Sequence, residues 1–107
     1  MPFLSASDFK SREVFPGVTI RVASSERMTY SFLTFSPRAV LKEHKHPHEQ
    51  FGVVLEGGFE LTIGGEKRVV KAGDTYVIPS NVPHSGVALD APARVLDVFS
   101  PPREDYR

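Results

Sequence analysis

The sequence contains no cysteine. This absence excludes disulfide bonds, thiolate metal ligands and cysteine nucleophiles. Any metal site in this protein must therefore be built from imidazole, carboxylate or amide groups.

The chain also lacks an excess of either charge, because 13 Lys and Arg residues balance 13 Asp and Glu residues. Proteins that bind nucleic acid usually carry a basic excess or a basic stripe, so no nucleic-acid partner is expected. No apolar run approaches the length that spans a membrane. The first 15 residues include Asp8 and Lys10 and lack the apolar segment of a signal peptide. We therefore expect a cytoplasmic protein without a membrane partner.

The length of 107 residues predicts one domain over residues 1–107. Hydrophobic residues make up 40% of the chain, which is ordinary for a globular protein and leaves room for a modest core. Dimerisation is an option for a protein of this size. Phe32, Leu33 and Phe35 could contribute to a homodimer interface, although a role in the core is favoured for most of them.

What the sequence does contain is a series of short β-type segments separated by Gly, Pro and Asn, with no helical period. This pattern predicts an all-β sandwich or barrel. The pair Gly64-Gly65 tolerates the positive φ angles of a tight hairpin. The first dozen residues could form a strand, a helical turn or an arm. The expected strands are Val18–Ala23, Met28–Phe35, Ala39–His44, Gln50–Glu56, Phe59–Ile63, Lys67–Val70, Thr75–Ile78, His84–Ala88 and Arg94–Phe99.

Three of the four histidines, His44, His46 and His48, lie within five residues, and the fourth is His84. Residues two apart in an extended segment point to the same face, so His44 and His46 can converge on one ion. Imidazole is a common ligand of divalent metals. A lone H-x-H more often belongs to a surface loop that binds no metal. The spacing of the other residues around it therefore decides between a metal site and such a loop. For His48 we favour a solvent-facing neighbour over a ligand or proton carrier.

The spacing around these histidines resembles the two motifs of the cupin superfamily, G-x5-H-x-H-x3,4-E-x6-G and G-x5-P-x-G-x2-H-x3-N. The resemblance implies a double-stranded β-helix, or jelly-roll barrel, with motif 1 at about 44–57 and motif 2 at about 73–88. It also implies one divalent transition metal, bound by His44, His46, Gln50 and His84. The matching residues are His44-x-His46-x3-Gln50-x6-Gly57 and Gly73-x5-Pro79-x-Asn81-x2-His84-x3-Ala88.

Four departures from the motifs stand out. The opening glycine of the first motif is absent, and Pro37-Arg38 occupies that region. Asn81 replaces a glycine, but asparagine also tolerates the left-handed conformation. Nothing explains Ala88 in place of the final asparagine. Gln50 replaces the usual glutamate, and a neutral amide would leave the ion its full double charge and make it a stronger Lewis acid. Three imidazoles and an amide suit Mn, Fe, Ni, Co or Zn about equally.

The segment from Arg94 to Phe99 places Asp97 and Phe99 on one face by strand alternation. If the opposite face packs outside the barrel, Asp97 points inward, where a carboxylate needs a partner or a chemical role. Pro101-Pro102 ends the strand and can fold Arg103 over the mouth of the barrel. The plainer alternative is that Asp97 forms a salt bridge at a strand end and that Arg103 is a solvated residue of the tail.

Five short stretches together resemble one branch of small cupins, the pectin-degradation proteins that linearise 4,5-unsaturated monouronates from pectin and alginate. The resemblance implies a small sugar acid as substrate, with Asp97, Phe99 and Arg103 lining its site. Asp97 would transfer a proton, Arg103 would bind the carboxylate and Phe99 would form an apolar wall. The stretches are H-P-H-E-Q, V-L-E-G, T-I-G-G-E, I-P-S-N-V-P-H and D-V-F-S-P-P-R-E-D-Y.

The expected activity is thus a metal-dependent ring opening and ketonisation of such uronates. Two alternatives stay open at this point. One is another cupin metalloenzyme, such as a dioxygenase-type oxidoreductase. The other is a non-catalytic module that binds or senses a sugar acid.

Overall fold

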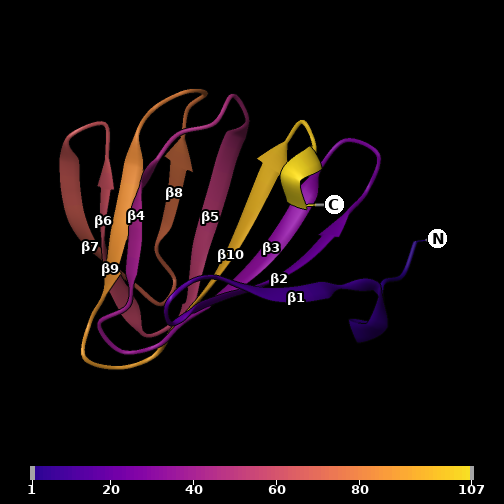
Figure 1. Ribbon diagram of the computed structural model, residues 1–107. Helices are drawn as coiled ribbons and strands as arrows, with labels where there is room; N and C mark the ends of the chain where they lie inside the picture. The colour runs from indigo at the N-terminus through magenta and orange to yellow at the C-terminus, as the bar shows by residue number, and fades with distance from the viewer. Residues whose placement is uncertain (1, 107) are drawn as a thin grey trace.

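A computed structural model describes residues 2–106 and shows ten strands within them, arranged in two antiparallel sheets (Figure 1). The larger sheet has the order β1-β2-β3-β10-β5-β8, and the smaller has the order β4-β9-β6-β7. Two short 3-10 helices, Ala6–Asp8 and Glu104–Tyr106, lie near the ends of the chain. The strands are β1 Lys10–Phe15, β2 Val18–Ser24, β3 Thr29–Phe35, β4 Val40–His44, β5 Glu49–Glu56, β6 Gly58–Ile63, β7 Glu66–Lys71, β8 Thr75–Ile78, β9 His84–Ala88 and β10 Ala93–Ser100.

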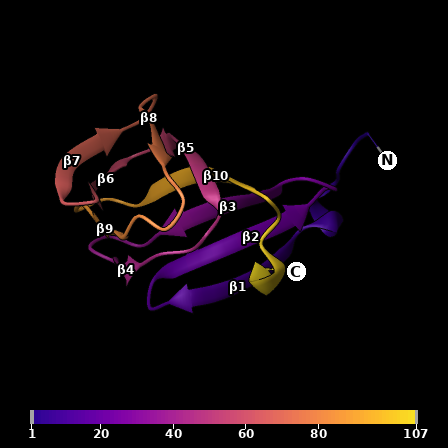
Figure 2. The ribbon, with the colours of Figure 1, turned by 90° about the horizontal axis from the view of Figure 1, so that it is seen from above.

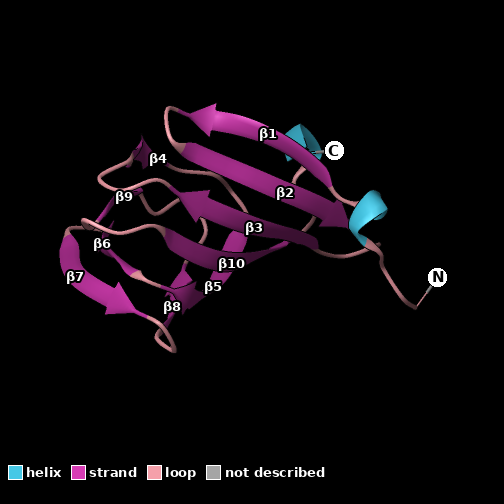
Figure 3. Cartoon of the chain, turned by 90° about the horizontal axis from the view of Figure 1, so that it is seen from below, coloured by secondary structure: helices cyan, strands magenta, loops and turns pink. Residues whose placement is uncertain are grey.

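The all-β prediction is confirmed, and each of the nine predicted strands is present with ends that move by at most one residue. The one strand that was not predicted, β1, begins within the first dozen residues, for which a strand, a helical turn and an arm were all considered. Its residues are mostly polar and exposed because it is an edge strand that, among the described strands, pairs only with β2 (Figure 3). A strand with solvent on its other edge and little buried surface carries no clear apolar alternation.

The core lies between the two sheets and is formed by residues that point inward from β2, β3, β5, β6, β7, β9 and β10, in alternation along β2 and β10. At its centre the rings of Phe35 and Phe59 stack with centroids 5.3 Å apart. Leu33 and Phe35 are buried, which confirms the core role favoured for them. Phe32 lies on the opposite face of β3 and packs against Phe9. The homodimer stays a prediction.

The backbone bears out the expectations for two turns and explains one departure from the motif. Gly64 and Gly65 connect β6 to β7 with φ angles of +56° and +90°. Asn81 adopts φ +63°, so the left-handed turn survives the replacement of glycine. Arg38 lies six residues before His44, where the motif has its first glycine, and takes φ +65°. The chain thus keeps the left-handed turn there with a side chain that disfavours it.

The two sheets diverge toward one side, so that β1, β2 and part of β3 extend beyond the smaller sheet (Figure 1). The C-terminal segment leaves β10 and crosses this uncovered region toward β1 (Figure 2). Two hydrogen bonds fix its course: the backbone N–H of Arg103 donates to Thr29 on β3, and Arg12 on β1 donates to the carbonyl of Asp105. Within residues 2–106 no helix is long and apolar enough to cross a membrane.

Candidate metal centre

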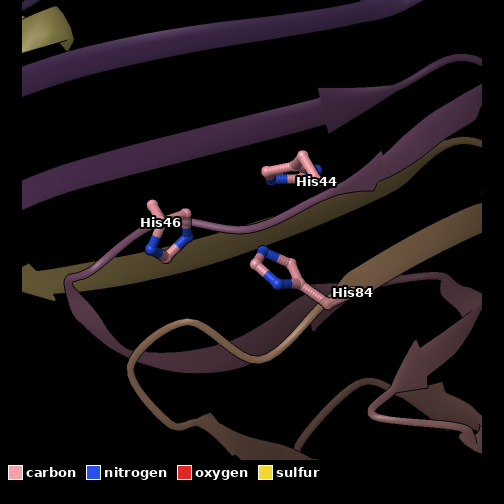
Figure 4. A group of neighbouring side chains, drawn as sticks. All are labelled: His44, His46 and His84. Carbon is pink, nitrogen blue, oxygen red and sulfur yellow. The ribbon is translucent and has the colours of Figure 1, made fainter.

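Three imidazole rings from the two motifs meet at one point (Figure 4). His44 ends β4, His84 begins β9, and these two residues are paired across the sheet. His46 follows in the connection to β5. The ring centroids of His84 lie 4.2 Å from His44 and 5.0 Å from His46. One nitrogen from each ring lies within 4.8 Å of the others, so the three histidines could hold a metal ion.

The backbone fixes which nitrogen of each ring carries the proton. Each Nδ1 lies within hydrogen-bond distance of a backbone carbonyl oxygen, which can only accept, so Nδ1 must donate and Nε2 keeps its lone pair. Metal-binding histidines are oriented in this way by the partner of their second nitrogen. The pairs are His44 Nδ1 to Lys42 O at 2.8 Å, His46 Nδ1 to His48 O at 3.1 Å, and His84 Nδ1 to Val82 O at 2.9 Å.

Gln50 on β5 completes a donor set that fits a divalent cation. Its Oε1 lies 3.0 Å from Nε2 of His46, although both atoms are acceptors once Nδ1 of His46 carries the proton. Burial lowers the pKa of His46. A second proton on Nε2, which would turn this contact into a hydrogen bond, is therefore disfavoured. Burial likewise lowers the pKa of His84 to about 4, and its buried Nε2 has no hydrogen-bond partner within the described residues. A cation among these lone pairs would satisfy all of them.

His48 lies outside the group of three. Its side chain is half-buried and its ring centroid is 5.5 Å from that of His46. Its contribution to the centre comes from the main chain, because its carbonyl oxygen accepts the hydrogen bond from Nδ1 of His46.

Asp97 points inward from β10 and is only 4% exposed, as the strand alternation predicted. The hydroxyl of Tyr76 donates to its Oδ1 at 2.6 Å, and the amide of Gln50 also donates to its carboxylate. Within residues 2–106 the carboxylate forms no ion pair, so the alternative of a salt bridge at a strand end is wrong. Burial raises the pKa of Asp97 to about 6.

Arg103 folds back over the mouth of the barrel, as the Pro101-Pro102 pair predicted, and is only 8% exposed. Its guanidinium lies over the ring of Tyr106 at 4.0 Å and over that of Phe99 at 4.9 Å. It donates to Asp105 from Nε at 3.2 Å and from Nη2 at 2.7 Å, which holds the pKa of Asp105 below its usual value. The alternative of a solvated tail residue is therefore wrong.

Three residues of the candidate metal centre, His44, Gln50 and His84, line one cavity of about 230 Å³ together with Asp97 and Arg103. Aliphatic and aromatic side chains make up the rest of its lining. The arrangement can hold a small anion against a cation and a buried acid. The lining residues are Val14, Phe15, Leu33, Leu41, His44, Gln50, His84, Asp97, Phe99, Arg103 and Tyr106.

Sequence reasoning did not find Tyr76, Thr29, Asp105 or Tyr106. Asp105 follows Arg103 by two residues, a spacing that allows a local ion pair and could have drawn attention. Tyr76 carries no such signal, because its link to Asp97 depends on how β5, β8 and β10 are paired.

A family model for the cupin domain matches residues 31–99. The pectin degradation protein KdgF of Dickeya dadantii (strain 3937) is 41% identical over 73 residues, which make up 67% of this chain and 66% of that protein, just under two thirds. The solved structure of KdgF from Halomonas sp. is 33% identical and superposes with a TM-score of 0.88. The match covers 98% of this chain and 97% of the other. Bacillus subtilis oxalate decarboxylase, solved in a study of its Mn(II) centers, is 27% identical with a TM-score of 0.81, over 92% of this chain and 29% of the decarboxylase.

Proposed function

The chain belongs to the cupin domain family, and we propose that it catalyses the metal-dependent ring opening and ketonisation of 4,5-unsaturated monouronates from pectin or alginate. The observation that carries the proposal is a single cavity lined by three of the four candidate metal-centre residues, His44, Gln50 and His84, and also by the buried acid Asp97 and by Arg103. The similarity to KdgF proteins from two organisms supports the choice of substrate class.

The proposed reaction is an isomerisation, so it needs no oxidant or reductant. The C1–O5 bond of the ring breaks as the C1 hydroxyl loses its proton, which leaves an aldehyde at C1 and an enolate at C5. Protonation of C4 then converts the enolate to a ketone. The site must therefore bind a carboxylate, stabilise negative charge on oxygen, and move one proton.

His44, His46 and His84 would hold the ion through their Nε2 atoms, and Gln50 would hold it through Oε1. A bound divalent ion would supply Lewis-acid stabilisation of the negative charge on a substrate oxygen. Because all four donors are neutral, the positive charge would reach the cavity undiminished.

Arg103 would bind the carboxylate of the substrate. Asp105 occupies its Nε and one side of Nη2, which leaves the Nη1 and Nη2 end of the guanidinium for a second, two-pronged contact. The rings of Phe99 and Tyr106 hold the guanidinium plane in place. The substrate carboxylate would therefore meet a preformed partner.

Asp97 would carry the proton from the C1 hydroxyl to C4. A carboxyl with a pKa near 6 is available in both protonation states around neutral pH, which suits a group that accepts a proton and then returns it. Phe99, which lines the same cavity, would limit the access of water to the enolate.

The proposal is tested by following the ultraviolet absorbance of the conjugated unsaturated acid with and without the protein. We expect the protein to accelerate its loss, and Asp97→Asn and His46→Ala to abolish the acceleration. Wild-type rates in both variants would contradict these roles. Oxygen consumption during turnover would instead indicate an oxidoreductase, and tight binding without turnover would indicate a sensor.

A further inference from the structure

A row of three residues crosses three neighbouring strands of the larger sheet beside the cavity. Asp97 on β10 is paired with Gly52 on β5, and Gly52 is paired with Tyr76 on β8. Side chains of directly paired residues project from the same face of a sheet. Asp97 and Tyr76 therefore point to the same side, with a residue that has no side chain between them.

The glycine is what allows the two outer residues to touch. A Cβ atom on Gly52 would overlap Cζ, Cε1 and Oη of Tyr76, so the phenol ring lies directly over the backbone at this point. Beyond the Gly52 backbone, the hydroxyl of Tyr76 donates a hydrogen bond to Oδ1 of Asp97 at 2.6 Å. Glycine in the middle of a strand weakens the strand, and close approach of another group is a physical reason for it.

Tyr76 contacts Asp97 from outside the cavity. It does not line the 230 Å³ cavity, whereas Asp97 does. Its ring packs edge-on against Phe59 in the core, with centroids 6.2 Å apart. Burial raises the pKa of the phenol well above its usual value of 10, so the hydroxyl keeps its proton and can serve as a donor.

We propose that Tyr76 is a positioning residue that fixes the orientation of the Asp97 carboxylate toward the cavity, and that Gly52 provides the space for it. The kinetic part of this inference rests on the function proposed above, because it assigns proton transfer to Asp97. A side chain held by a fixed hydrogen bond spends more of its time in the productive geometry, which raises the rate of the chemical step.

The kinetic test compares Tyr76→Phe with Tyr30→Phe, since each substitution removes a hydroxyl that makes a 2.6 Å hydrogen bond and keeps the ring. We expect Tyr76→Phe to lower kcat about 10-fold to 100-fold with KM and metal content close to wild type. Tyr30→Phe should leave kcat unchanged. Equal kcat in wild type and Tyr76→Phe would overturn the inference.

Gly52→Ala tests the spatial part, because its methyl group would displace the ring of Tyr76. We expect it to lower kcat in the wild-type background and to have no further effect in a Tyr76→Leu background, where the ring is absent. Equal effects in the two backgrounds would show that Gly52 acts independently of Tyr76 and would overturn this part.

Crystal structures separate this inference from the proposed function. In Tyr76→Phe we expect the Asp97 side chain to occupy more than one rotamer, while wild type shows one. A single unchanged rotamer in the variant would overturn the positioning role whatever the kinetics show. Absence of uronate turnover in wild type would contradict the proposed function, and the rotamers would still decide the role of Tyr76.

Discussion

Nε2 of His46 and Oε1 of Gln50 face each other at 3.0 Å, although neither atom has a proton to share when Nδ1 of His46 donates to the carbonyl of His48. Two acceptors at this distance repel unless a positive charge lies beside both. On its other side, the amide of Gln50 donates to Asp97. Gln50 thus joins the candidate metal centre to the buried acid, and a carboxylate could not donate to Asp97 in this way.

We therefore predict opposite effects of Gln50→Glu on metal binding and on turnover. The carboxylate should tighten metal binding about 10-fold, because it adds a negative ligand. It should also lower kcat about 10-fold or more, because a second carboxylate beside Asp97 disfavours the charged form of both. Metal affinity is measured by competition with a chelator, and kcat by loss of the conjugated acid. A variant with tighter metal binding and wild-type kcat would contradict the link to Asp97.

Asp105→Asn should raise KM for the uronate about 5-fold to 10-fold with little change in kcat, because a looser Arg103 weakens substrate binding. The matched control is Asp90→Asn, which removes the partner of Arg38 from an exposed ion pair. Steady-state kinetics on both variants checks the prediction. A lower KM in Asp105→Asn would show instead that Asp105 competes with the substrate for Arg103.

The pH dependence of stability should reveal the buried state of Asp97 after the metal has been removed with a chelator. The pKa of Asp97 is raised from 3.8 to about 6, so this group makes the free energy of unfolding fall as pH rises through that window. The pKa of His84 is lowered from 6.5 to about 4, so this group makes it rise from pH 4 to pH 6.5.

Because these contributions oppose each other, Asp97→Asn should unmask the histidine contribution. We expect the gain in unfolding free energy between pH 4 and pH 6.5 to be larger in Asp97→Asn than in wild type, by on the order of 3 kcal/mol. Urea unfolding at several pH values measures it. If both proteins show the same gain, Asp97 is not an ionisable group that is buried without a compensating charge, and the prediction is contradicted.

Arg38→Gly should stabilise the protein by about 1 kcal/mol, since glycine adopts the left-handed conformation without the steric cost that Arg38 bears. Arg38→Ala is the control. It also removes the exposed ion pair with Asp90 but keeps the unfavourable backbone, so it should give no gain. Urea midpoints of the two variants decide between backbone conformation and the ion pair as the cause.

The sequence alone predicted much of this architecture because strand alternation and turn residues are local properties. The inward direction of Asp97 and the left-handed turn at Asn81 followed from such local rules and are present in the structure. Strand β1 has little buried surface, so its pattern was too weak to predict it. The contact between Tyr76 and Asp97 was also beyond reach, because it depends on the register of three strands that are distant in sequence.

The convergence of four side chains on one cation is tested most directly by a crystal structure with anomalous data at the absorption edges of Mn, Fe, Co, Ni and Zn. We expect one anomalous peak about 2.0–2.3 Å from the Nε2 atoms of His44, His46 and His84 and close to Oε1 of Gln50. A peak elsewhere, or none in crystals of protein purified without chelator and supplied with these metals, would contradict it.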